Sequence, residues 1–265
     1  MASNLRDLRE YTLPDSGPQS TISVSLSSSS QSSSIPLRPT STGGILINLS
    51  ICQIQSSKPE NAITIGAIRN VLDLSTILDV GVLALTNVES QESMTLYSAA
   101  YSPSVRPNIK FSWGRDIRES VDFVSIPSLE SGESVTLAFE LSIQTLRDLW
   151  ARRSLKKSSA PEFPFTSPGK WRLHFVSKES IGFHHNGIVL WTWGALEGEL
   201  QGKKFEYPTE TRYPFEAEAE ERMKEERREG KYVQLHPNDC AEVECFVAVE
   251  TDTEGVIIEF VNGDQ

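Results

Sequence analysis

The chain has 265 residues, of which 38% are hydrophobic and 23% charged, and its formal net charge is -11 at pH 7. This length suits one large domain or two small ones. An acidic surface is repelled by phosphate backbones, so we expect no nucleic acid partner. No apolar run approaches the roughly 20 residues that a membrane-spanning helix needs, so we expect no membrane partner either.

The cysteines and the N-terminal composition bear on the cellular compartment. Three cysteines, Cys52, Cys240 and Cys245, are a sparse and odd number that argues against a disulfide framework. The first twenty residues lack the apolar segment of a secretory signal. We therefore expect an intracellular protein, in the cytoplasm or the nucleus.

The N-terminal part of the chain differs in composition from the rest. Residues 27–34 are seven serines and one glutamine, and such a run buries too little apolar surface to offset its ordering entropy. Apolar residues alternate with serines over residues 21–26, a pattern compatible with an edge strand. We predict a largely disordered Ser-rich tail over residues 1–43 and a single domain over residues 44–265.

The predicted domain contains about ten short segments with the period of a strand. The clearest is residues 134–143, where Val135, Leu137 and Phe139 point one way and polar residues the other. Residues 80–86 are apolar on both faces, as in a central strand. Further strands are predicted at residues 45–51, 63–65, 94–97, 109–113, 169–176, 188–193, 243–249 and 256–261. This turn-marked spacing favours a mainly β fold, an antiparallel β-sandwich of immunoglobulin-like general shape, although the Cys–Trp–Cys spacing of true immunoglobulin domains is absent.

Two segments have the spacing of a helix instead. Apolar residues share one face near residues 145–153, and Thr145 with Asp148 resembles a capping box. Residues 215–229 are highly charged and place acidic and basic residues four apart, which predicts a solvated helix. We interpret this charged helix as part of an insertion near residues 205–230.

Four residues near the most aromatic strand are the candidate binding residues. Trp191 and Trp193 share one face of the predicted strand. If that face is exposed they form a stacking platform for sugars or a peptide, and if it points inward they belong to the core, which we favour. His184 and His185 precede the strand, but adjacent residues on an extended chain diverge and chelate poorly. We therefore expect no metal and no cofactor.

The other reactive or charged residues do not form a recognisable catalytic or binding motif. No G-x-S-x-G, P-loop, G-x-G-x-x-G or H-E-x-x-H motif occurs. A catalytic pair of Cys240 with His236 lacks any neighbour that would activate the thiol. One basic cluster suits an anionic partner or a nuclear-localisation patch, although cations at a helix C-terminus are the simpler explanation. It contains Arg147, Arg152, Arg153, Lys156 and Lys157.

These observations predict a non-enzymatic intracellular β-sandwich that acts as a binding or protein–protein interaction module, with no catalytic residues. Two alternatives stay open. One is a carbohydrate-binding module that uses Trp191 and Trp193, and the other is a hydrolase-like enzyme without a recognisable motif. A structural subunit of a larger assembly is a third class. The partner and the oligomeric state do not follow from the sequence.

Overall fold

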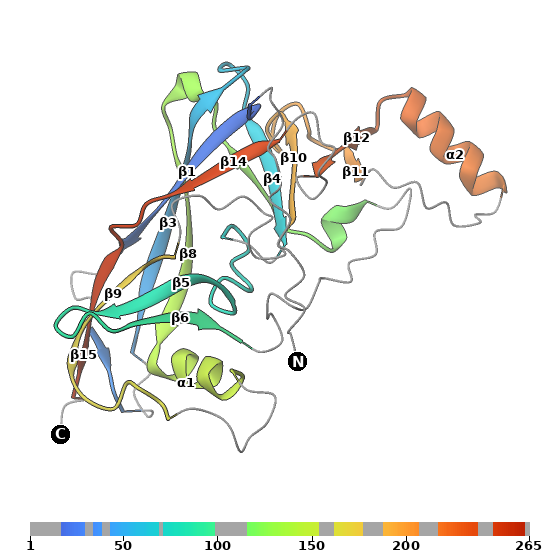
Figure 1. Ribbon diagram of the computed structural model, residues 1–265. Coiled ribbons are helices and arrows are strands. Elements are labelled where there is room, and N and C mark those ends of the chain that lie inside the picture. The colour runs from blue at the N-terminus through green and yellow to red at the C-terminus, as the bar shows by residue number, and fades with distance from the viewer. Residues whose placement is uncertain are drawn as a thin grey trace, which may run out of the picture.

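A computed structural model of the chain describes residues 17–29, 34–38, 43–68, 71–98, 116–153, 162–176, 188–206, 217–237 and 246–262. Strands dominate these residues, so the predicted mainly β fold is confirmed (Figure 1). The strands form both antiparallel and mixed sheets. Three strand pairs are parallel: β1 (Ser20–Ser28) with β14 (Val247–Thr251), β15 (Val256–Val261) with β2 (Ser34–Pro36), and β11 (Lys204–Glu206) with β12 (Tyr232–Gln234). The expectation of antiparallel pairing throughout is therefore wrong, because alternation along a strand carries no information about its neighbour's direction.

The first sheet has the order β14 (Val247–Thr251), β1 (Ser20–Ser28), β3 (Gly44–Ser56) and β8 (Val135–Ser142). The strand predicted at residues 21–26 is thus confirmed as β1, but its edge position is wrong. It lies between β3 and β14, and the side chains of Ile22 and Val24 are fully buried. Both β1 and β2 (Ser34–Pro36) lie within residues 1–43.

The second sheet has the order β2 (Ser34–Pro36), β15 (Val256–Val261), β9 (Gly169–Phe175), β5 (Val80–Asn87) and β6 (Ser93–Tyr97). The predicted central strand is confirmed as β5, which lies between β9 and β6 and is buried on both faces over residues 80–85. In Figure 1, β5 and β6 run across the direction of β3 and β8.

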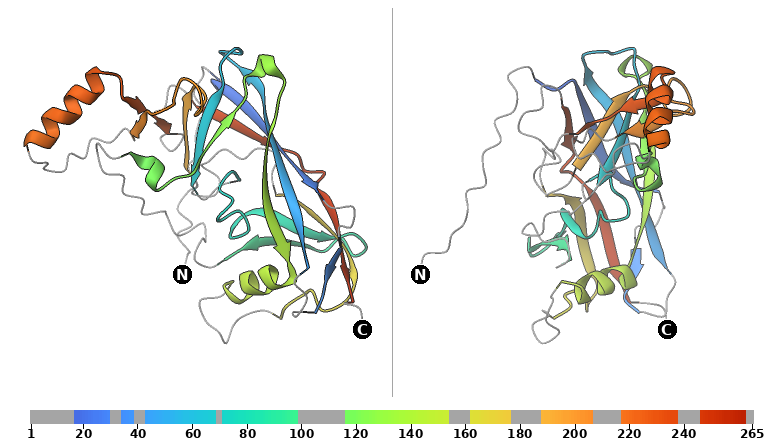
Figure 2. Two further views of the ribbon diagram at one scale, coloured as in Figure 1. Left: turned by 180° about the vertical axis from the view of Figure 1, so that it is seen from behind. Right: turned by 90° about the vertical axis from the view of Figure 1, so that its right-hand side faces the viewer.

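The third sheet has the order β13 (His236–Pro237), β10 (Ile188–Trp193), β4 (Ile63–Ile68) and β7 (Phe123–Ile126). Two connections join the third sheet to the first. Along the chain, β3 of the first sheet is followed by β4 of the third, and β7 of the third sheet is followed by β8 of the first. The pairs β3–β8 and β4–β7 therefore diverge from one end like the two arms of a V (Figure 2). We refer to these two strand pairs as the arms.

A buried glutamine forms hydrogen bonds that hold together the end where the arms meet. Gln53 on β3 is 5% exposed. Its side-chain amide donates to the carbonyl of Asn61, at 3.1 Å, and to the carbonyl of Pro127, at 2.9 Å. These carbonyls belong to the two connections between the arms. The Ser20 hydroxyl donates back to the Gln53 Oε1 at 3.2 Å. One side chain thus joins both connections to β1.

The sheets share one main hydrophobic core, to which strands of all three sheets contribute. A second, smaller apolar cluster lies beside the third sheet and consists of Ile117, Leu190, Leu200, Phe205 and Leu235. It joins the third sheet to the short pair of β11 (Lys204–Glu206) and β12 (Tyr232–Gln234). This second cluster holds the charged part of the molecule against the main body.

Both predicted helices are confirmed. The first, α1 (Ile143–Ala151), begins two residues before the predicted start, because Ser142 is its N-cap and accepts from the Thr145 N–H at 3.1 Å. The proposed capping box is wrong, since Asp148 accepts from Gln144 instead. The charged helix, α2 (Ala217–Arg228), projects from the β strands (Figures 1 and 2) and carries an ion pair between Glu220 and Lys224 at 3.3 Å.

Candidate binding cavity

The two candidate tryptophans lie in β10 but differ in burial. Trp191 is 1% exposed and belongs to the main core, so the inward interpretation is confirmed for this residue. Its ring lies 4.8 Å from the His236 ring and 5.6 Å from that of Trp193. Trp193 is half-buried, and the Lys58 ammonium lies 5.5 Å from its ring. A sugar therefore has no open Trp191 face on which to stack.

The other histidine and cysteine candidates include His184, His185, His236, Cys240 and Cys245. His184, His185, Cys240 and Cys245 lie outside the described residues, as does the predicted strand at residues 109–113. His236 is half-buried, and this burial lowers the pKa of its imidazole. In the described part of the chain, no three His, Cys, Asp or Glu side chains gather as a metal site would require.

A cavity of about 280 Å³ lies between the two arms. Its lining comes from both arms and from two loops, and consists of Ile51, Ile65, Ile68, Leu72, Asp73, Leu74, Ser75, Ser120, Val121, Asp122, Val124, Ile126 and Leu137. The contributing segments are far apart in sequence. Since no short motif encodes such a site, the sequence offered no signal that would have found it.

The strands and the loops that line this cavity differ in chemistry. We call the loop residues Asp73, Ser75, Ser120 and Asp122 the rim. Ile51 and Leu137 line it from one arm, and Ile65 and Ile126 line it from the other. The polar lining residues all come from the loops: Asp73, Ser75, Ser120 and Asp122. The Ser75 hydroxyl donates to the Asp73 carboxylate at 2.6 Å. The cavity can therefore surround an apolar group while two carboxylates meet a cationic or donating group beside it.

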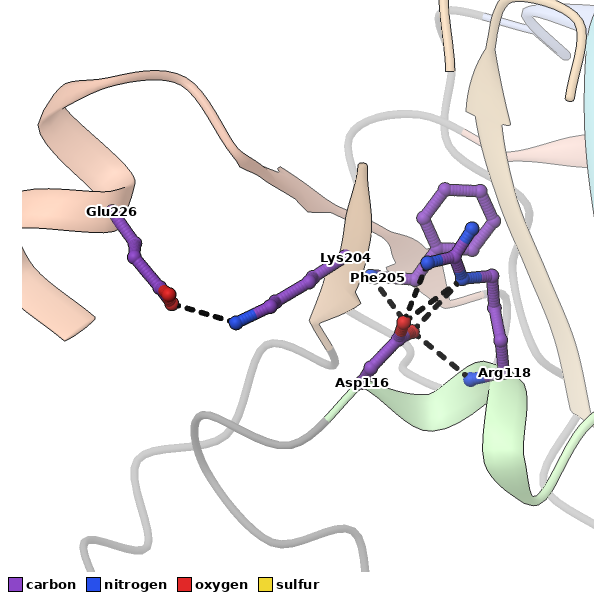
Figure 3. Close-up of polar contacts among 5 residues, drawn as sticks. All are labelled: Asp116, Arg118, Lys204, Phe205 and Glu226. Atoms are coloured by element: carbon purple, nitrogen blue, oxygen red, sulfur yellow. Dashed lines mark hydrogen bonds and ion pairs between the residues drawn. The ribbon is translucent and has the colours of Figure 1, made fainter. Parts of the chain in front are cut away.

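A network of hydrogen bonds centred on Asp116 holds one of the rim loops (Figure 3). Asp116 is the N-cap of the short 3₁₀ helix η2 (Ile117–Glu119), which leads directly to the rim at Ser120. Its carboxylate accepts from the Phe205 N–H at 3.1 Å and from the Arg118 guanidinium at 2.6 to 3.1 Å. The guanidinium also lies 5.0 Å from the Phe205 ring. These contacts fix the start of the rim loop to β11.

Two further ion pairs attach the charged helix to the same strand. Lys204 donates to Glu226 at 2.7 Å, as Figure 3 shows, and Arg227 pairs with Glu206. The hydrogen bond to Glu226 is the main factor that raises the pKa of Lys204. β11 therefore links α2, η2 and the rim, which makes these charges part of the scaffold.

The pKa of Asp116 makes this part of the scaffold sensitive to acid. Burial alone would raise the pKa, but the hydrogen bonds from Arg118 and from the Phe205 N–H outweigh it and lower the pKa. A carboxyl whose folded pKa is depressed contributes stability above its unfolded pKa, about 3.9. That contribution is lost as the pH falls through the lower folded pKa.

Replacing Asp116 with asparagine should remove this contribution while it preserves the shape of the side chain. We expect the free energy of unfolding at pH 7 to fall by roughly 1–2 kcal/mol, and the difference from the unmodified chain to shrink below about pH 3. Urea melts across this pH range measure it. Asp122→Asn is the control and should leave stability unchanged, because Asp122 is exposed. A difference that persists at acid pH would contradict the assignment.

Comparisons with known proteins give no relative from which a function can be transferred. No protein-family model, no curated protein and no solved structure matches this chain. Among the described residues, no helix has the length and apolar character needed to cross a membrane.

Proposed function

We propose that this protein is a non-enzymatic binding module that takes up an apolar side chain of a protein partner in the cavity between its arms. The observation that carries the proposal is the pairing of an apolar interior with a polar rim in one concave site. A basic residue beside the inserted side chain would meet Asp73 and Asp122. The overall charge of -11 also favours a basic segment.

The size of the cavity supports a side chain over a whole small-molecule ligand. Its volume of about 280 Å³ lies just below the usual range for ligand pockets. A single aromatic or branched side chain fits such a space, and buried aromatic anchors carry much of the energy of protein interfaces. The carbohydrate alternative gains no support, because Trp191 is buried.

We further propose that the first two sheets, which share one core, form a β-sandwich of immunoglobulin-like general shape. We also propose that the protein lies in the cytoplasm or the nucleus. The free thiol of Cys52 is consistent with a reducing compartment.

Filling the cavity should weaken partner binding without unfolding the protein. The test selects a phage-displayed library of random peptides on the full chain. We expect enriched peptides that carry a large apolar residue next to lysine or arginine. Leu137→Phe, which fills the cavity from β8, should weaken their binding at least about tenfold, or about 1.4 kcal/mol.

The matched control uses the next residue on the same strand. Ala138 is exposed and points to the other face of the sheet, so Ala138→Phe should leave peptide binding intact. At the rim, Asp122→Asn should weaken binding of the basic peptides, whereas Glu133→Gln outside the lining should not. Equal binding to Leu137→Phe and Ala138→Phe, with both variants folded, would refute the cavity as the recognition site.

A further inference from the structure

A second concave surface lies elsewhere on the molecule, between the second sheet and the end of α1. It encloses about 690 Å³ and is more open than the cavity between the arms. Its lining residues are Asn87, Glu92, Ser93, Met94, Thr95, Tyr97, Trp150, Arg153, Glu162, Pro164, Ser167 and Trp171. The ribbon views place β6 near α1 (Figures 1 and 2). We call it the Arg153 groove.

Arg153 is held in this groove by two aromatic rings. Its guanidinium carbon lies 4.3 Å from the ring centre of Tyr97 and 4.3 Å from that of Trp150. Phe163 contacts Trp150 edge to face at 6.4 Å, and further ring contacts continue through Phe165 to Trp171. Stacking on aromatic rings restricts the guanidinium plane, so its orientation is set before any ligand arrives.

Among the residues that the structure describes, no carboxylate matches the charge of Arg153. Its neighbour Arg152 pairs with Asp79 at 3.0 Å, but within the described ranges no carboxylate forms an ion pair with Arg153. A guanidinium whose faces are covered by rings still has N–H donors along its edge. These donors form a flat fork that matches a carboxylate or a phosphate.

The other lining residues favour a carboxylate over a phosphate as the ligand of Arg153. Glu92 and Glu162 also line the groove, and both are exposed. Their charges oppose a phosphate dianion more than a carboxylate with a single charge. Ser93, Thr95 and Ser167 offer hydroxyls, while Met94 and Trp171 offer apolar surface. The lining therefore suits a ligand with one carboxylate and an aromatic or apolar body.

We propose that the Arg153 groove binds a monoanionic carboxylate attached to an aromatic or apolar group, with Arg153 holding the carboxylate. The C-terminal residue of a peptide and a small aromatic acid both have this chemistry. This groove is separate from the cavity between the arms, since the two sites share no lining residue.

The test titrates the full chain with four probes and follows the indole N–H signals of its tryptophans by NMR. The probes are phenylacetate, N-acetyl-phenylalanine, the uncharged amide of N-acetyl-phenylalanine, and phenyl phosphate. Either carboxylate should shift the signals of Trp150 and Trp171 in a saturable way and leave that of Trp191 in place. The amide should bind at least about tenfold more weakly, as expected for loss of a charge-assisted pair. Tighter binding of N-acetyl-phenylalanine than of phenylacetate would identify the C-terminal residue of a peptide as the ligand. The reverse order would identify a small aromatic acid.

Variants separate Arg153 from its neighbour. Arg153→Lys should weaken carboxylate binding about tenfold, because the ammonium keeps the charge but loses the flat fork, whereas Arg152→Lys should not. Glu92→Gln should strengthen binding about two- to fivefold by removing a like charge, which keeps the test decisive if the Arg153 variant does not fold. Equal affinity for the amide, tighter binding of phenyl phosphate, or no binding of either carboxylate would overturn the proposal.

Discussion

Replacing Trp191 with alanine is expected to lower the free energy of unfolding by roughly 3–5 kcal/mol. The side chain is 1% exposed and is among the largest fully buried side chains described. It pairs across strands with Ile65 on one side and with His236 on the other. Truncation would leave a cavity at the centre of the third sheet, where few neighbours can move to fill it. Urea melts at pH 7 measure the loss.

Two companion variants show whether packing is the cause. Trp193→Ala should cost clearly less, because Trp193 is half-buried. Trp191→Phe should cost less than Trp191→Ala, since it keeps most of the buried ring. The Trp191 indole N–H is buried and has no hydrogen-bond partner among the described residues, so phenylalanine loses no such bond. A loss well under about 1 kcal/mol for Trp191→Ala would mean that the ring faces outward.

Replacing Gln53 with leucine is expected to cost roughly 2–4 kcal/mol. The change preserves much of the apolar volume but removes both donors to the carbonyls of Asn61 and Pro127. It also removes one of the two acceptors within reach of the Ser20 hydroxyl, the other being the Gln55 carbonyl at 3.1 Å. Partly buried carbonyls without partners carry a desolvation penalty, and two of them lie where the arms meet. Chemical denaturation measures the change in stability.

Gln55 supplies a matched control for this substitution. It lies two residues further along β3, and its side chain is exposed. Gln55→Leu should change stability by no more than about 0.5 kcal/mol, as is usual for surface positions. Equal costs at residues 53 and 55 would show that the bridge between the connections contributes nothing.

The sequence predicted well those elements whose pattern reflects local burial. The strand that became β8 alternates because one face is buried, with Phe139 and Leu141 inward and Ala138 and Glu140 exposed. The strand that became β5 is apolar on both faces because it is central. The helix α2 was predicted from its charge spacing, which recurs as the Glu220–Lys224 pair. In each case a residue's partners or its burial follow from its own neighbours along the chain.

Features that depend on distant pairing were beyond the sequence. Residues 20–28 carry serines as if for an edge strand, yet the C-terminal strand β14 covers their free side. The start of α1 depends on the extended conformation of Ser142, which ends β8 and pairs with Gly44 of β3. The binding cavity combines two arms and two loops, so no window of residues contains it. Pairing between distant segments decides all three features.

The most direct test of the central claim asks whether the cavity between the arms admits an apolar group. Titration of methyl-labelled protein with benzene, followed by NMR, gives the answer. We expect saturable shifts of the methyl signals of Ile51, Val124 and Leu137, and no shift at the fully buried Leu83 in the second sheet. The response should be lost in Leu137→Phe. Shifts that are absent, or that persist unchanged in Leu137→Phe, would contradict the claim.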